Sequence, residues 1–119
     1  MARPTGEREP HRLYRRWIEE LWAGRPVADE LVSDDFVGHW PTREVHGPAE
    51  LQTMVDETRA TFRDLEFYVD VDPFANGEML AARWIATGAR DRGPVLVAGN
   101  DILRIRDGRI VEYWACSSA

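Results

Sequence analysis

The spacing of hydrophobic residues changes part-way along the chain, close to residue 62. Before that point they recur every three or four positions, most clearly in PHRLYRRWIEELWA, residues 10–23. This spacing predicts an amphipathic helix, and the Gly24 that follows is a typical helix stop. The N-terminal half is therefore expected to hold three helices, at 10–23, 26–32 and 48–62, with a short extended piece that ends at Pro41 and a loop over 41–47.

After residue 62 the hydrophobic period becomes two. Leu65, Phe67, Val69 and Val71 alternate with charged and polar residues, which is typical of a half-buried strand. Asn-Gly and Asp-Gly pairs mark tight turns between the strands that follow. The expected strands are 65–72, 79–90, 94–106 and 109–116.

Helices followed by a run of strands predict an α+β fold. We expect three N-terminal helices packed into a curved, antiparallel, four-stranded meander sheet, with one short extra strand. A sheet curved around helices gives a cone-shaped barrel with an internal pocket, a common place for ligands.

The composition narrows the functions that this fold could serve. The chain has 119 residues and a net charge of −6, which fits one domain and gives no general attraction to nucleic acid or to an anionic membrane. It has no apolar run of bilayer length and no signal-like segment at its start, so we expect a cytoplasmic protein. We assign residues 1–9 to a disordered tail and residues 10–119 to a single domain.

Two residue types exclude particular chemistries. All fifteen basic residues are arginine, so Schiff-base catalysis through a lysine is excluded, as is a phosphate-binding P-loop. The single cysteine, Cys116, forms no internal disulfide and is expected to be an inert thiol.

One acidic residue interrupts an otherwise apolar strand face. Alternate residues of the strand at 94–106 are apolar except for Asp101, which therefore faces the core. Burial disfavours a carboxylate and raises its pKa, which suits a group that takes a proton from carbon and returns it to oxygen. The alternative is a structural Asp101, satisfied by a backbone N–H or by Arg90.

An ordered set of segments carries a resemblance to a known family. The helix ending in WAG is followed by LVSDDFVGHWP, HGPAEL, FRDLEF, LAARWIATG and NDILRIRDGRIVEYW. Together, over about residues 14–114, they resemble the SnoaL-like polyketide cyclases, in the superfamily of nuclear transport factor two and ketosteroid isomerase. That superfamily hosts cyclases, isomerases, dehydratases, epoxide hydrolases and binding domains, so the fold does not by itself fix the reaction.

The resemblance assigns roles to two positions. Asp101 matches the acid/base of the SnoaL-like cyclases and a protonated hydrogen-bond donor of ketosteroid isomerase. His39, in VGHWP, stands where many SnoaL-like members have a histidine and where the isomerase has its general base, an aspartate. His39 is thus a candidate partner base for Asp101 or an orienting group, and its alternative is a half-exposed histidine at the rim of the sheet.

The hairpin segment departs from the cyclases. Where they often have a longer hairpin with a Thr-His pair, this chain has TGARDRGPVLVAGN, and Arg90 takes the place of the histidine. The shorter hairpin predicts a shallower or differently gated pocket mouth. Arg90 shares strand parity with Trp84 and could hold a carboxylate or enolate oxygen; otherwise it is a solvated residue at a strand end.

Aromatic residues are the candidate pocket walls. Five tryptophans in so small a domain suggest a flat, apolar ligand. Trp17 matches the position of the isomerase's oxyanion-hole tyrosine. Glu112 and Tyr113 flank the last strand, and one of them could lie at a dimer interface. The candidate substrate-binding residues are Tyr14, Trp17, Trp40, Trp84, Arg90 and Trp114.

The leading hypothesis is a cofactor-free acid/base enzyme, a cyclase or isomerase of a small apolar carbonyl compound related to polyketides or terpenoids. Its catalytic residues would be Asp101 and His39, and we expect no metal site. The alternatives are epoxide hydrolysis or epoxide-opening cyclisation, and a non-catalytic module that binds a small ligand. Sheet faces in this superfamily often pair, so we also expect a homodimer through the sheet.

Overall fold

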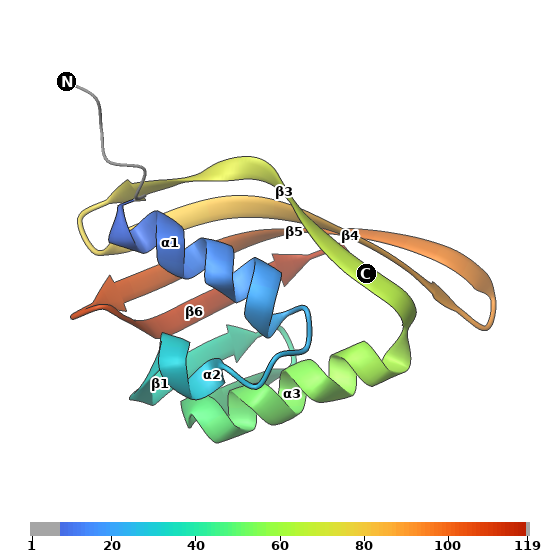
Figure 1. The fold of residues 1–119 in the computed structure, drawn as a ribbon, viewed down its shortest axis with the longest axis horizontal. Coiled ribbons are helices and arrows are strands. Elements are labelled where there is room, and N and C mark those ends of the chain that lie inside the picture. The colour runs from blue at the N-terminus through green and yellow to red at the C-terminus, as the bar shows by residue number, and fades with distance from the viewer. Residues whose placement is uncertain (1–7, 119) are drawn as a thin grey trace.

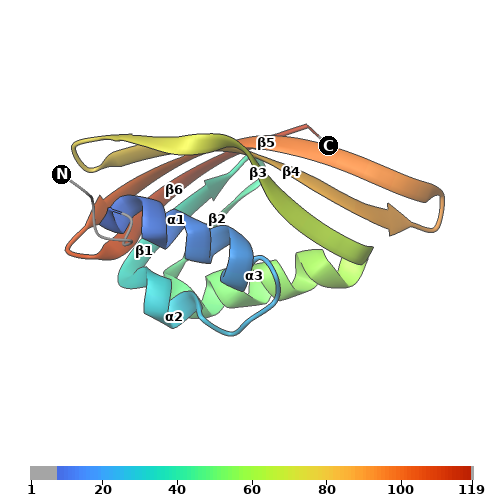
Figure 2. The same cartoon turned by 45° about the horizontal axis from the view of Figure 1, so that its top comes forward.

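The computed structural model describes residues 8–118 and shows three helical segments on one side of a curved sheet (Figure 1). In the second view all the helices lie against the same, concave face (Figure 2). The first segment, α1 (Glu9–Arg16), continues into a π-helical turn, η1 (Trp17–Leu21), and is followed by α2 (Ala28–Leu31) and α3 (Gly47–Thr61). The three expected helices are confirmed, although the second is shorter than the sequence suggested. The expected tail falls largely outside the described residues, and Glu9 already belongs to α1.

The sheet has six strands in the order β2-β1-β6-β5-β4-β3. The strands are β1 (Val32–Trp40), β2 (Arg43–His46), β3 (Arg63–Asn76), β4 (Met79–Arg90), β5 (Gly93–Arg106) and β6 (Arg109–Ser117). The meander from β3 to β6 is antiparallel, as expected, but β1 pairs with β6 in parallel.

Two expectations about the sheet are wrong. Residues 41–47 hold strand β2, which pairs antiparallel with β1, and not only a loop. The sheet is also open and mixed, not a closed antiparallel barrel, because β2 and β3 occupy its two edges and do not pair with each other. The hollow is instead closed on its concave side by the helices.

The π-helical turn determines how the first helix meets the sheet. The Trp22 amide donates to the Trp17 carbonyl, five residues back and not four, so the turn is wider than in an α-helix. Trp17 and Leu21 are fully buried and Trp22 nearly so. The widened turn thus directs both Trp17 and Trp22 toward the hollow of the sheet.

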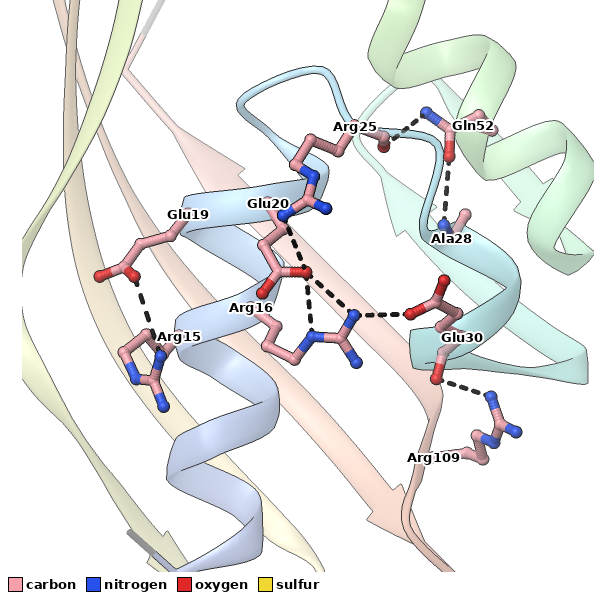
Figure 3. A network of polar contacts seen from close by, with 9 residues as sticks. All are labelled: Arg15, Arg16, Glu19, Glu20, Arg25, Ala28, Glu30, Gln52 and Arg109. Atoms are coloured by element: carbon pink, nitrogen blue, oxygen red, sulfur yellow. Dashed lines mark hydrogen bonds and ion pairs between the residues drawn. The ribbon is translucent and has the colours of Figure 1, made fainter. Parts of the chain in front are cut away.

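Polar contacts hold the helices together at their outer surface (Figure 3). The guanidinium of Arg16 donates to Glu20, one turn on, and to Glu30 of α2, at 2.9 and 2.7 Å. Gln52 of α3 accepts from the amide of Ala28, which lies at the start of α2. These contacts fix the helices against one another over the sheet. None of the helices within residues 8–118 is long and apolar enough to cross a membrane.

Candidate functional site

A cavity of about 470 Å³ lies between the helices and the concave face of the sheet. Its walls come from η1 and the adjoining Trp22, the second half of α3, the end of β1, and strands β3, β4, β5 and β6. Most lining side chains are aromatic or aliphatic, which agrees with the expected apolar pocket. Four of the six candidate substrate-binding residues are among them: Trp17, Trp40, Trp84 and Arg90.

Asp101 lies in the wall of this cavity. It is on the inward row of β5, directly opposite Ala82 of β4, and its residue is only 1% exposed. It is the one buried charged or polar residue in the described part of the chain. Asp101 thus faces the core, as the alternation of β5 predicted.

Three side chains donate hydrogen bonds to the Asp101 carboxylate. The Tyr113 hydroxyl and the Trp84 indole N–H donate to Oδ1, at 2.5 and 3.0 Å, and the Tyr14 hydroxyl donates to Oδ2, at 2.9 Å. Oδ1 has thus used both of its lone pairs, whereas Oδ2 keeps one. Oδ2 is the oxygen at which a proton can be added without breaking a hydrogen bond.

Burial and hydrogen bonding act on this carboxyl in opposite directions. Burial raises the pKa of Asp101 from 3.8 to about 6, and the hydrogen bonds from Tyr113, Tyr14 and Trp84 limit the rise. Burial, together with the negative charge of Asp101, raises the pKa of both Tyr14 and Tyr113 well above 10, so both remain hydroxyl donors. At neutral pH the carboxylate is therefore mostly ionised but weakly solvated, as a general base requires.

The close approach of Trp84 depends on a glycine. Trp84 lies opposite Gly99 across the β4–β5 pair. Gly99 is two residues before Asp101 and is on the same face of β5. A Cβ on Gly99 would lie 2.3 Å from Cζ2 of the indole and 2.8 Å from its Nε1. Because Gly99 has no side chain, the indole ring can pack close to β5 and donate its N–H to Asp101.

Tyr113 is a site residue that the sequence reasoning missed. It was considered only as a strand-flanking or interface residue, yet it is 3% exposed, lines the cavity and makes the shortest bond to Asp101. Its ring also contacts Trp17 and Trp40, each with centroids 4.9 Å apart. Tyr14 supports the site from behind: it is fully buried and reaches Asp101, but it is not part of the cavity lining.

His39 and Trp114 lie on the opposite face of the sheet from Asp101. Gly38 and Trp40 point inward from β1, so His39 points outward, and neither His39 nor Trp114 lines the cavity. The two rings stack with centroids 5.6 Å apart, and His39 contacts Glu112 at 2.7 Å and Glu44 at 3.1 Å. This geometry gives His39 no access to Asp101 and Trp114 no contact with a ligand in the cavity.

A prediction follows for this outer histidine. The hydrogen bond to Glu112, and next the one to Glu44, raise the pKa of His39 above 6.5. The stabilisation from this contact is thus present below pH 6.5 and is lost as the pH rises through the raised value. In Glu112→Gln we expect the His39 pKa to fall, as followed by NMR titration of its ring protons. Glu66→Gln on β3 is the control; an equal titration in all three proteins would show that Glu112 does not act on His39.

Within residues 8–118 no group of three or more His, Cys, Asp or Glu side chains is arranged to hold a metal ion. The polar groups at the site are the Asp101 carboxylate, hydroxyl donors and indole N–H groups. Both Trp17 and Trp40 line the cavity, and neither indole N–H has a hydrogen-bond acceptor among the described residues.

Comparison with known proteins agrees with this architecture. The profile of the SnoaL-like domain matches residues 11–113. The chain belongs to the SnoaL-like domain family. A search of curated proteins finds no match.

Solved structures of this SnoaL-like fold are similar along nearly the whole chain. A candidate SnoaL-like polyketide cyclase from Jannaschia sp. CCS1 has a TM-score of 0.84 and 18% identity, covering 99% of this chain and 91% of its own. IdmH from Streptomyces antibioticus, described as a candidate polyketide cyclase, has a TM-score of 0.79 and 23% identity, covering 94% of this chain and 93% of its own. TsrD from Streptomyces laurentii has a TM-score of 0.81 and 19% identity, covering 97% of this chain and 92% of its own. At these identities the likeness establishes the fold.

Proposed function

We propose that this SnoaL-like protein is a cofactor-independent acid/base enzyme, a cyclase or isomerase of a small, largely apolar carbonyl compound. The observation that carries the proposal is the Asp101 carboxylate, buried in the wall of an apolar cavity of about 470 Å³ with a pKa raised to about 6. Polyketide- or terpenoid-like compounds fit such a cavity, and the neighbouring folds include candidate polyketide cyclases.

The first step moves one proton. The Asp101 carboxylate takes a proton from the carbon next to the substrate carbonyl, and the C–H electron pair becomes an enolate. The indole N–H of Trp17 or Trp40 can donate to the enolate oxygen, where negative charge develops. Arg90 does not fit this role, because it lies eight residues along β4 from the position opposite Asp101.

The second step returns the proton and distinguishes the two reactions. In an isomerisation the Asp101 carboxyl gives the proton to another carbon of the extended enolate. In a cyclisation the enolate carbon bonds to a second carbonyl carbon of the same molecule, and the alkoxide formed takes the proton from Asp101. Both leave Asp101 as it began, with no other reactant consumed.

The test is exchange of the acidic C–H protons of 2-tetralone, a compact bicyclic ketone, in D₂O, followed by proton NMR. The native protein should accelerate the loss of this signal over buffer at equal pH, and the acceleration should require Asp101. Acceleration that is the same without the Asp101 carboxylate would contradict the proposal.

Epoxide opening is less well supported by the site. It needs a carboxylate base, a second acid and an arginine between them. Asp101 is the one carboxyl side chain among the described residues that line the cavity, and Arg90 is at the other end. For an identified substrate, ¹⁸O from labelled water in the product would indicate hydrolysis, and its absence would favour isomerisation or cyclisation.

The non-catalytic alternative rests on one observation. Asp101 is almost inaccessible and accepts three hydrogen bonds, as a purely structural anchor would. Under that hypothesis the native protein binds apolar ketones without accelerating exchange. The same tetralone experiment therefore separates a binding module from an enzyme.

We also propose that two copies pair through the outer face of the sheet. A continuous apolar row crosses that face through paired positions of β3, β4, β5 and β6: Phe74, Ala81, Ile102 and Trp114. Phe74 is 64% and Ile102 45% exposed in the single chain, which is unusual for large apolar residues in a row. A second copy of the same row would cover it, as isologous dimers do.

Light scattering coupled to size-exclusion chromatography tests this pairing. The native chain should elute with twice the mass of the monomer, and Ile102→Glu should reduce the mass to that of the monomer, because it places a charge in the middle of the row. Asn76→Glu, at the β3–β4 turn, is the matched control. A native monomer at tens of micromolar, or a dimer that persists in Ile102→Glu, would rule out this interface.

A further inference from the structure

The cavity has one charged side chain toward each end. Among the described residues that line it, only Asp101 and Arg90 carry a charge. Asp101 lies opposite Ala82, and Arg90 is eight residues farther along β4 on the same inward row. Strands rise about 3.3 Å per residue, so about 26 Å of strand separates the two backbone positions. The two groups cannot act on the same substrate atom.

The Arg90 side chain turns inward at the mouth of the cavity. Its guanidinium carbon is 4.5 Å from the centre of the Phe62 ring, and both residues line the cavity. A guanidinium on an aromatic face keeps its N–H edges free for planar, bidentate contacts. No carboxylate among the residues that the structure describes pairs with Arg90, whereas its neighbour Arg63 pairs with Asp91 at 3.3 Å.

The charge around Arg90 differs from that of the molecule as a whole. The chain as a whole carries a net charge of −6, which disfavours anions. At this end, however, Arg63 donates to the Arg90 backbone carbonyl at 3.1 Å, and Arg92 follows in the β4–β5 turn. Three arginines, Arg63, Arg90 and Arg92, thus lie beside two aspartates, Asp64 and Asp91, so the local charge is positive although the chain as a whole is negative.

We propose that the substrate is elongated and carries an anionic group, a carboxylate or a phosphate, at the end away from the reacting carbonyl. Arg90 binds this group at the mouth, the aromatic walls hold the apolar body, and the carbonyl end reaches Asp101. The assignment of the carbonyl end rests on the proposed function; the assignment of the anionic end rests on Arg90 alone. Arg90 is then a specificity-determining residue and takes no part in the proton transfer.

A series of matched probes tests the anionic end by isothermal titration calorimetry. The probes are 6-(2-naphthyl)hexanoate, its methyl ester and 5-(2-naphthyl)pentyl phosphate. We expect the acid to bind about tenfold more tightly than the ester, as one charge-assisted contact at a partly exposed site allows. The preference should weaken with added salt, because Arg90 is exposed. If the phosphate probe binds more tightly than the carboxylate probe, the substrate carries a phosphate. If the carboxylate probe binds more tightly, the substrate is a free acid.

Variants at the mouth assign the preference to one residue. Arg90→Met keeps the apolar stem over Phe62, so the acid and the ester should then bind equally. Arg92→Met, in the adjacent turn, is the matched control and should keep the native preference. Equal binding of acid and ester by the native protein, a preference that survives Arg90→Met, or no binding of any probe would each overturn the proposal.

The result can be read separately from the catalytic proposal. Binding of these probes requires no proton transfer, so the preference for the acid should persist in Asp101→Asn. If the tetralone exchange fails but the preference holds, the chain binds apolar anions without the proposed chemistry. If exchange holds but the preference is missing, the enzyme acts on neutral ketones and Arg90 is a solvated residue at a strand end.

Discussion

Asp101→Asn is expected to reduce the accelerated exchange of 2-tetralone to the rate in buffer while the protein remains folded. The carboxamide has the shape of the carboxylate. Its oxygen can accept from Trp84 and Tyr113 at the Oδ1 position, and its NH₂ can donate to the Tyr14 hydroxyl, which rotates to accept. The network therefore keeps its partners, but the side chain can no longer take a proton. General base catalysis of this kind contributes about 10²–10⁴-fold.

The control for this experiment is Asp72→Asn, an equal change of charge at an exposed position of β3. It should exchange tetralone at the native rate. Circular dichroism and thermal unfolding of both variants show whether the fold is intact. If folded Asp101→Asn kept more than half of the native acceleration, the assignment of Asp101 as the base would be wrong.

The pH dependence of the same variant provides an independent check. Because the active form of the base is ionised, the native exchange rate should rise with pH through about 6, and no such rise should remain in Asp101→Asn. The effect on stability has the opposite sign. The folded state holds the Asp101 proton more tightly than the unfolded state, so the neutral carboxyl contributes stability below pH 3.8 that is lost as the pH rises to about 6.

The size of that stability effect follows from the shift in the Asp101 pKa. A change from 3.8 to about 6 corresponds to about 3 kcal/mol, at roughly 1.4 kcal/mol per pH unit. Between pH 3 and pH 7, urea unfolding should therefore show the native protein losing about that much free energy of unfolding relative to Asp101→Asn. Parallel stability curves for the two proteins would show that the Asp101 pKa is not raised by burial.

The sequence predicted those parts of the fold that local periodicity specifies. The amphipathic helices and the antiparallel meander follow from periods of 3.6 and two, and the turns from Asn76-Gly77 and Asp107-Gly108. Strand β2 was missed because its four residues are too few to show a period. The parallel pairing of β1 with β6 joins segments far apart in sequence, and no local pattern reports it.

In the candidate site, too, the residues that local periodicity specifies were predicted and the others were missed. Asp101 was placed correctly because β5 alternates without interruption from residue 95 to 105. Strand β6 does not, since Ile105 pairs with Ile110 but Arg104 pairs with Glu112, which leaves Val111 as a bulge. Counting by two from Ile110 puts Trp114 inside, whereas the bulge reverses the faces and brings Tyr113 to Asp101. A bulge of this kind has no clear sequence signal here, so Tyr113 could not be found by parity.

Gly99→Ala is expected to have the second largest effect, because one methyl group meets the Trp84 ring at 2.3 Å. Real Cβ atoms do not approach so closely, so the indole must move into the cavity and its N–H must leave Asp101. The loss of a buried hydrogen bond to a carboxylate costs about 1–3 kcal/mol. With one of its three donors gone, the Asp101 pKa should rise above about 6.

Thermal unfolding and the pH profile of tetralone exchange measure these two consequences in Gly99→Ala. A double-mutant cycle with Trp84→Phe assigns them to the ring. Phenylalanine lacks Nε1 and the outer indole atoms that the new methyl group meets, so in that background Gly99→Ala should cost little. It should even stabilise the strand slightly, since alanine is favoured over glycine within a strand. If Gly99→Ala destabilises the native protein and the Trp84→Phe variant equally, the glycine serves the backbone of β5 and does not position Trp84 on Asp101.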